Sequence, residues 1–154
     1  MDRVVVGVDG SDTAQRALDA AAEQAAAFGC PLLVVAVWSA PKRSFAFPVS
    51  FDPADFEEYA AETARHAVNR VIERHPDLHV SPESIEGDAR TVLVEAAGPD
   101  DLLVVGSQGN TGVIGLMLGS VASHCVNHAR GPILVVPAAD DGDDGRFHRP
   151  LDND

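Results

Sequence analysis

Four short runs of branched apolar residues constrain the fold of this chain more than any other feature of its sequence. They occupy residues 3–8, 31–38, 101–105 and 133–136, and apolar residues follow one another within them without alternation. Continuous runs of this kind are typical of parallel strands that helices cover on both faces. A more polar segment, residues 79–86, is expected to add a further strand between the second and third runs.

Segments with apolar residues at helical spacing separate these strands. We expect helices over residues 12–28, 53–75, 89–97 and 120–129. Each segment begins beside a residue that can cap or start a helix: Ser11 or Asp12, Pro53, Asp88 and Ser120. Regular alternation of strands and helices predicts a three-layer α/β/α fold with an open sheet of five parallel strands.

The composition of the chain limits its partners. The 154 residues suit one domain, which we place over residues 1–137, and the acidic segment 138–154 is expected to be a disordered tail. The formal net charge is −13, and a surface this acidic repels nucleic acid and anionic membranes. Lys42 is the single lysine, and an acidic, lysine-poor chain suits a high-salt cytoplasm, so a halophilic origin is a hypothesis.

The compartment is inferred from segments that the sequence lacks. The opening MDRVVVGVDGS does not have the layout of a signal peptide, and no apolar stretch is long enough to span a bilayer. We therefore expect a cytoplasmic protein. In that setting Cys30 and Cys125 are expected to be two buried thiols rather than a disulfide.

The segment between the fourth strand and the last helix, residues 106–120, reads GSQGNTGVIGLMLGS and contains five glycines and no charged side chain. Ligands of open α/β sheets bind beyond the carboxyl ends of the strands, where both this segment and Asp9 are expected. Glycines expose main-chain N–H groups, and the start of the next helix adds its own N–H groups and the positive end of its dipole.

Such a segment can bind phosphate without a lysine. Ser107 and Ser120 can donate hydroxyl hydrogen bonds, and Asp9 can accept from a ribose or hold a metal ion bound to phosphates. The alternative is a connection with ordinary turn glycines, because neither the dinucleotide pattern GxGxxG nor a P-loop is present.

Both ends of the domain resemble one known family. VVVGVDGS resembles the first strand and Asp of the universal stress proteins, and residues 118–137, LGSVASHCVNHARGPILVVP, resemble their last helix and strand. The family's nucleotide signature is Gly, two residues, Gly, nine residues, then Gly-Ser or Gly-Thr, and it is matched by Gly106, Gly109, Gly119 and Ser120. The resemblance, to the ATP-binding subgroup, implies a Rossmann-like fold, similar to the adenine nucleotide α-hydrolases, with strand order 3-2-1-4-5.

The resemblance implies ATP as the ligand, with Mg²⁺ reducing the repulsion between the triphosphate and the acidic chain. By position, Asp9 matches the residue that contacts the ribose, with Gly7 and Val8 beside it, and it can reach the metal through Mg-ATP. Val37 matches the residue whose main chain reads adenine. The ribose and phosphates would be held by Gly106, Ser107, Gln108, Gly109, Asn110, Thr111, Gly112, Gly119, Ser120 and Val121. Gln108 stands where the family usually has a basic residue or His.

No general base, nucleophile or catalytic cation is evident beside the expected phosphates. We therefore expect a regulator or sensor in a stress response, with slow ATP hydrolysis as an alternative. A second alternative is an interaction protein of the same fold that binds no nucleotide. A third is an enzyme that attacks the α-phosphate, which would need basic residues that this segment lacks.

Two further regions carry expectations. The family commonly dimerises through its last strand, so the apolar edge strand Ile133–Val136 is expected to pair with a second copy. The long loop 39–52 is rich in Pro and Phe, and it can cover the base with Phe45, Phe47 and Phe51.

The last helix also carries two histidines. His124 and His128 are four residues apart, a spacing that zinc sites use, but no third ligand is evident and a solvated helix face is expected. Ser120 is expected to be the N-cap of this helix. Four of its apolar residues are expected to pack in the core, namely Val121, Cys125, Val126 and Ala129.

Overall fold

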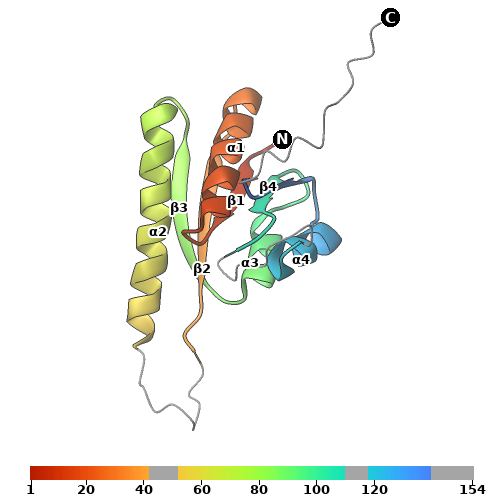
Figure 1. Ribbon diagram of the computed structural model, residues 1–154. Coiled ribbons are helices and arrows are strands. Elements are labelled where there is room, and N and C mark those ends of the chain that lie inside the picture. The colour runs from red at the N-terminus through yellow and green to blue at the C-terminus, as the bar shows by residue number, and fades with distance from the viewer. Residues whose placement is uncertain (42–51, 110–117, 140–154) are drawn as a thin grey trace, which may run out of the picture.

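One parallel sheet organises the molecule, which the computed structural model describes over residues 1–41, 52–109 and 118–139 (Figure 1). Its strands are β1 (Val4–Val8), β2 (Leu32–Trp38), β3 (Val80–Glu86), β4 (Leu102–Gly106) and β5 (Ile133–Val136). They lie in the order β3-β2-β1-β4-β5, and each neighbouring pair runs parallel. The predicted fold class and strand order are confirmed.

Four helices cover the sheet in the described residues: α1 (Asp12–Phe28), α2 (Pro53–Arg74), α3 (Ala89–Ala96) and α4 (Ser120–His128). α1 and α2 cover one face, and α3 and α4 cover the other, which gives three layers (Figure 1). The predicted lid residues Phe45, Phe47 and Phe51 and most of the predicted tail lie outside the described residues.

β1 explains why the apolar runs are continuous. Val4, Val6 and Val8 belong to the core that includes α1 and α2, whereas Val5 belongs to the core beneath α3 and α4. Val4, Val5 and Val6 are each 0% exposed, so both faces of the strand are removed from water. Burial of each such side chain contributes roughly 1.5–3 kcal/mol, and a polar residue on either face would forfeit that term.

Short polar side chains begin three of the helices. The Ser11 hydroxyl accepts from the main-chain N–H of Ala14 at 3.2 Å, and Gly29 ends α1 with φ 65°. Asp52 accepts from the N–H of Ala54 at 3.0 Å at the start of α2. Asp88 accepts from the N–H of Arg90 at 2.9 Å at the start of α3. Of the two predicted candidates, Ser11 is therefore the cap of α1, and Asp88 is confirmed for α3.

The start of α4 corrects the sequence expectation. Gly119, with an extended backbone (φ −61°, ψ 164°), is the N-cap, and Ser120 is already the first helical residue. The N–H of Gly119 donates to the carbonyl of Ser107 at 2.7 Å, which fixes the chain one residue before the predicted cap. In the part of the chain that the structure describes, no side chain forms a capping hydrogen bond at the start of this helix.

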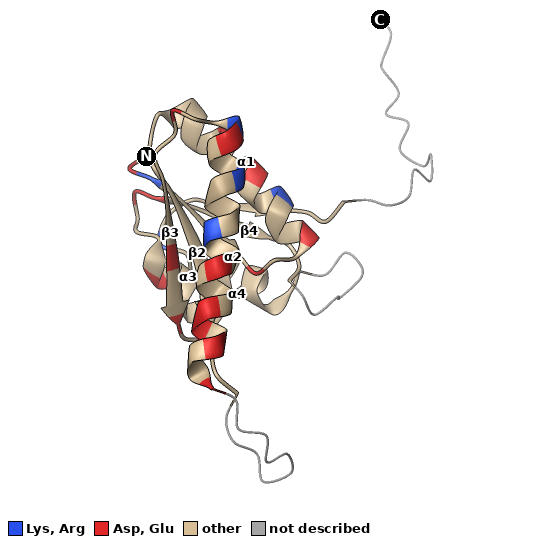
Figure 2. Cartoon of the chain, turned by 90° about the vertical axis from the view of Figure 1, so that its left-hand side faces the viewer, with Lys and Arg blue, Asp and Glu red and all other residues tan. Residues whose placement is uncertain are grey.

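The charged side chains of α2 are mainly acidic near its start and mainly basic further along. Figure 2 shows acidic side chains gathered over its first half and basic ones further along, with Asp55 in the first turn and Arg74 in the last. This order complements the helix dipole. Arg74 Nη1 also lies 3.5 Å from Asp19 Oδ1 of α1, an exposed pair that contributes about 1 kcal/mol at most.

The buried carboxylate of Asp101 connects three segments at the edge of the sheet where β1 and β4 begin. Asp101 is 6% exposed, and its Oδ2 accepts from Arg3 Nε at 3.0 Å and from the N–H of Gly98 at 2.9 Å. Arg3 Nη2 also donates to the carbonyl of Ala96 at 2.8 Å. The start of β1, the end of α3 and the turn before β4 are thereby joined.

Gly131 supplies a stability test of this end of the fold. A Cβ at Gly131 would lie 2.7–2.9 Å from the carbonyl oxygens of Pro99, Asp101 and Gly98, none of which can rotate away. We expect Gly131→Ala to lower the free energy of unfolding by about 1–3 kcal/mol in urea denaturation. Gly98→Ala is the matched control, because its Cβ would meet only Asp101 Oδ2, at 3.5 Å. Equal midpoints for Gly131→Ala and wild type would contradict the packing described.

Candidate functional site

A cavity of about 280 Å³ lies at the carboxyl ends of β1, β2 and β4. The connections leave the sheet in opposite directions here, because β1 leads through α1 to β2 while β4 leads through α4 to β5. Ligands of open α/β sheets bind at such a switch in strand order. The cavity is therefore the first candidate for a functional site.

The structure brings the predicted site residues together around this cavity. Those that line it are Gly7, Val8, Asp9, Val37, Gly106, Ser107, Gln108, Gly109, Gly119, Ser120 and Val121. They come from β1, β2, β4 and α4, from the turn after β1 and from the loop after β4. Three further predicted residues lie outside the described part of the chain: Asn110, Thr111 and Gly112.

Sequence reasoning missed much of the apolar wall. Additional lining residues are Ala14, Val35, Ala89, Leu93, Val105 and Ala122. Val35 could have been found, because it lies two residues before Val37 and therefore on the same face of β2. Leu93 could not, since it comes from α3, which the sequence did not connect with the site. A Cβ on Gly7 would lie 2.8 Å from Leu93 Cδ1, so the glycine lets α3 approach the sheet.

Asp9 stands where β1 turns into α1. Its Oδ1 accepts from the N–H of Ser11 at 2.9 Å, and Gly10 between them has φ 82°. Its Oδ2 would lie 3.0 Å from a Cβ added to Gly109, so the glycine loop passes directly over the carboxylate. Asp9 orders its own turn and also faces the loop, and a larger residue at position 109 would meet it.

Ser107 fixes both ends of the glycine segment. Its N–H donates to the carbonyl of Val136 at 2.8 Å, and its carbonyl accepts from the N–H of Gly119 at 2.7 Å. Its hydroxyl accepts from the N–H of Ala138 at 3.3 Å. The main-chain N–H groups of Ser107 and Gly119 thus already have acceptors within the protein.

The next residues present N–H groups without an acceptor in the helix. The first intrahelical bond of α4 runs from the N–H of Ser123 to the carbonyl of Gly119, at 2.9 Å. Ser120, Val121 and Ala122 precede it, and all three line the cavity. Side chains cap α1, α2 and α3, whereas no described side chain caps α4. A ligand with an anionic group can occupy that position.

Positive potential in this site comes from main-chain N–H groups and not from cationic side chains of the described residues. The cavity-lining residues among those described include no Lys, Arg or His, and Asp9 is their one ionisable carboxylate. At the neighbouring start of α3, Asp88 is paired with Arg90, whose side-chain and main-chain hydrogen bonds lower the pKa of Asp88 to about 2. Asp88 therefore caps α3 itself, and within residues 1–41, 52–109 and 118–139 α4 is the one helix whose positive end has no side-chain cap.

Comparison with known proteins agrees with this arrangement. The sequence model of the universal stress protein family matches residues 1–137. The chain belongs to the universal stress protein family. A universal stress protein from Mycobacterium tuberculosis is 32% identical over 135 residues, which cover 86% of this chain and 44% of that protein. The chain thus spans less than half the length of the curated relatives it matches.

Solved structures of the family share the fold. A universal stress protein in complex with cAMP is 26% identical, with a TM-score of 0.62 over 88% of this chain and 96% of that chain. The universal stress protein from Archaeoglobus fulgidus in complex with dAMP is 24% identical, with a TM-score of 0.61 over 88% of this chain and 98% of that chain. At the latter identity the likeness establishes the fold alone.

Other predicted features have separate outcomes. Cys30 and Cys125 are both free and buried, as predicted, and burial raises the pKa of the Cys125 thiol. Val126 was expected in the core but is 46% exposed, because it is turned about 100° around α4 from Cys125, which is buried. Among the described residues, no helix has the length and apolar character needed to cross a bilayer.

Proposed function

We propose that this universal stress protein binds ATP with Mg²⁺ in the cavity and acts as a nucleotide-dependent regulator or sensor. The observation that carries the proposal is the start of α4, which has no side-chain cap among the described residues and lines the cavity together with Asp9. An anion at Ser120 and Val121 would meet N–H groups that have no acceptor in the helix. The cAMP complex of a family member supports an adenine nucleotide as the ligand class.

Each part of the nucleotide has a matching surface. The base would contact the apolar wall that includes Val35, Val37 and Leu93. The ribose hydroxyls would donate to Asp9. The phosphates would follow the main chain of Gly106–Gly109 to the start of α4, with the Ser107 hydroxyl as a donor. The family resemblance adds Asn110, Thr111 and Gly112 to the phosphate contacts.

Mg²⁺ fits this donor set when phosphates complete its shell. The described residues contain no group of three or more His, Cys, Asp or Glu side chains that could hold a metal ion by themselves. Mg²⁺ commonly uses one or two carboxylates together with phosphate oxygens and water, and Asp9 supplies one carboxylate. Bound there, the ion would neutralise part of the phosphate charge beside an acidic chain.

Regulation is a better match than efficient catalysis. The described cavity-lining residues offer no Lys or Arg to stabilise a transferring phosphoryl group, and Asp9 is already engaged by the turn to α1. Slow hydrolysis of ATP is the second candidate function, because binding of the phosphates and metal alone favours it. An interaction protein that binds no nucleotide is the third, and the absence of measurable ATP affinity would favour it.

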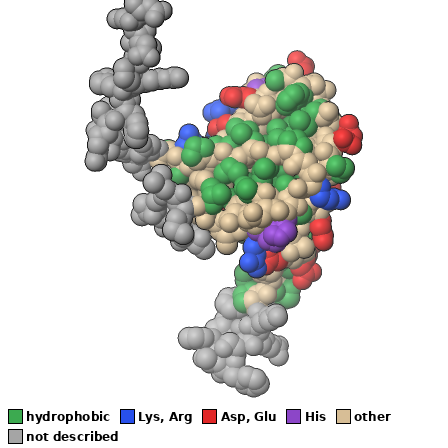
Figure 3. Space-filling model, turned by 90° about the vertical axis from the view of Figure 1, so that its right-hand side faces the viewer, with side chains coloured by type: hydrophobic (Ala, Val, Ile, Leu, Met, Phe, Trp, Pro, Cys, Tyr) green, Lys and Arg blue, Asp and Glu red, His purple; other side chains and the backbone are tan. Residues whose placement is uncertain are grey.

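We also propose a homodimer through β5. Ile133, Leu134 and Val135 are only partly buried at the edge of the sheet, and Leu118 and Val126 are 43% and 46% exposed. Figure 3 shows apolar side chains gathered on the side of the molecule that carries α4. An apolar edge of this kind favours pairing with another strand.

The geometry of β5 identifies the groups available for that pairing. The carbonyls of Pro132 and Val136 accept from β4 and the loop after it. Main-chain groups alternate along a strand, so Ile133 and Val135 direct their N–H and carbonyl groups away from β4. The protein is further proposed to act in a reducing cytoplasm, consistent with its two free thiols.

Gly109→Val tests the nucleotide site. The added side chain would displace Asp9 Oδ2, which lies 3.0 Å from the Cβ position, and would fill the path of the phosphates. We expect calorimetry with Mg-ATP to show at least about tenfold weaker binding, or about 1.4 kcal/mol. Gly98→Ala, at the far end of the sheet, is the control and should bind like wild type. A folded Gly109→Val protein with unchanged affinity would refute the assignment.

Val135→Pro tests the dimer. The substitution removes one outward N–H group without removing a bond to β4, so the sheet should persist while pairing fails. We expect sedimentation velocity at tens of micromolar protein to show a dimer for wild type and a monomer for Val135→Pro. Val135→Ala, which keeps the N–H group, should stay dimeric. A dimeric Val135→Pro protein, or a monomeric wild type, counts against pairing through β5.

Salt dependence tests the proposed halophilic origin. A net charge of −13 opposes folding by self-repulsion, and about 1 M salt reduces the Debye length to about 3 Å. We expect the melting temperature to rise by several degrees between low and molar KCl. Identical melting temperatures at both salt levels would remove the basis of the hypothesis.

A further inference from the structure

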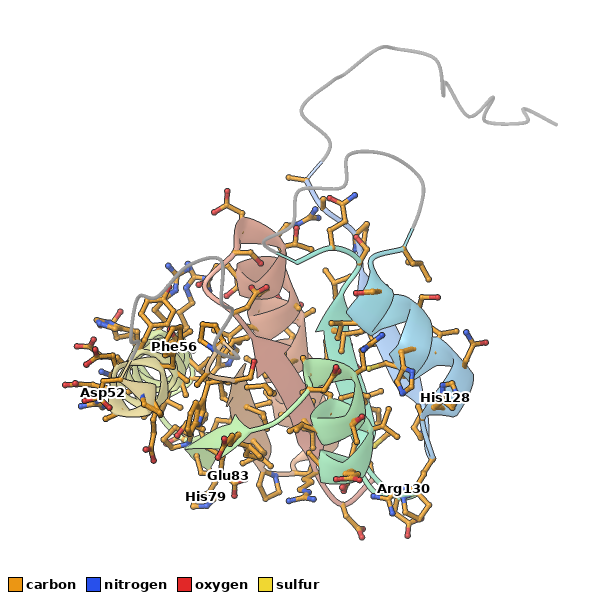
Figure 4. All side chains as sticks on the ribbon, turned by 90° about the horizontal axis from the view of Figure 1, so that it is seen from below. Asp52, Phe56, His79, Glu83, His128 and Arg130 are labelled. Atoms are coloured by element: carbon orange, nitrogen blue, oxygen red, sulfur yellow. The ribbon has the colours of Figure 1, made fainter. Side chains whose placement is uncertain are left out.

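Two histidines pair on the outer surface of α4, apart from the nucleotide cavity. The rings of His124 and His128 are stacked, with centroids 4.1 Å apart and planes inclined by 17°. His128 is exposed, and Figure 4 shows it on α4, with Arg130 just beyond the helix end. The ring contact was not predicted from sequence, which indicated only that both side chains share a helix face.

A main-chain hydrogen bond fixes the tautomer of one ring. His128 Nδ1 lies 3.0 Å from the carbonyl oxygen of His124. A carbonyl only accepts, so Nδ1 carries the hydrogen, and the neutral ring keeps its lone pair on Nε2. Metal-binding histidines commonly donate their second ring N–H to a carbonyl in this way, which orients the ring and raises its basicity.

The spacing of the rings suits two bonds to one metal ion. Two imidazole nitrogens on a shared ion, each about 2.0–2.1 Å from it, are about 3 Å apart. The ring centroids are 4.1 Å apart and the planes are inclined by only 17°, so both side chains must rotate out of the stack before their ring nitrogens point at one ion. No backbone movement is required, because positions four apart lie one above the other on a helix.

The surroundings also favour a cation. His128 lies in the last turn of α4, where the helix dipole is negative. The nearest cation in sequence, Arg130, donates its Nη2 to the carbonyl of Glu95 at 2.8 Å. Cys125, between the two histidines, is 0% exposed and faces the core, so its sulfur is not a ligand.

We propose that His124 and His128 form a two-imidazole site for a divalent transition-metal ion, with Cu²⁺ bound most tightly. Water molecules complete the coordination, because no group of three or more metal-binding side chains occurs in the described residues. The site is therefore open and exchangeable, unlike a closed structural zinc site. Cu²⁺ is favoured because imidazole sites follow the Irving–Williams order.

The test is a Cu²⁺ titration of the full chain followed by calorimetry and electron paramagnetic resonance. The reference protein carries His148→Asn, which removes the one histidine outside the described residues. We expect one Cu²⁺ per chain with a nitrogen hyperfine pattern from two imidazoles. His124→Asn and His128→Asn should each weaken binding at least about tenfold and reduce the pattern to one nitrogen.

His75 and His79 supply a matched control. They have the same four-residue separation, but His75 ends α2 and His79 precedes β3, so no helix aligns their rings. The double variant His75→Asn, His79→Asn should bind Cu²⁺ like the reference. Loss of binding in this control with retention in the α4 variants overturns the proposal, as does a reference spectrum without two imidazole nitrogens. Circular dichroism verifies that each variant is folded.

Discussion

Coverage of the sheet on both faces is the constraint on which the other features depend. Val4, Val5, Val6 and Val104 are each 0% exposed, so no face of the central strands reaches water. Helices must therefore cross over between strands, and every crossover begins at the carboxyl edge and returns to the opposite edge. The carboxyl ends of β1, β2 and β4 lie at one edge for this reason, and residues from all three strands line the cavity there.

Among the helices that begin at this edge, α4 differs from the others in how it starts. Ser11, Asp52 and Asp88 cap α1, α2 and α3, whereas α4 starts at a glycine without a side-chain cap. Asp9, the one carboxylate among the described residues that line the cavity, lies at the end of β1 in the same cavity. The start of α4 favours an anionic group, and Asp9 favours a hydroxyl that donates to it. A nucleotide carries both kinds of group in one molecule.

Local sequence patterns predicted the strands and helices. The exact start of α4 and part of the cavity wall depend on contacts between distant segments, which these patterns do not show. Strand order and the gathering of Gly7, Asp9, Gly106 and Gly119 followed from alternation and family resemblance. The N-cap of α4 is Gly119 and not Ser120 as predicted, because the N–H of Gly119 donates to the carbonyl of Ser107. The sequence also could not reveal Leu93 in the cavity wall, because that depends on how closely α3 approaches Gly7.

Ser107 connects the start of α4 with the end of the edge strand β5. Its three hydrogen bonds reach the start of α4, the end of β5 and the chain just past β5. Ser107 cannot shift toward the cavity by itself, since its movement would stretch its hydrogen bonds to Val136 and Ala138. A displacement of β5 would therefore be transmitted through Ser107 to the wall of the cavity.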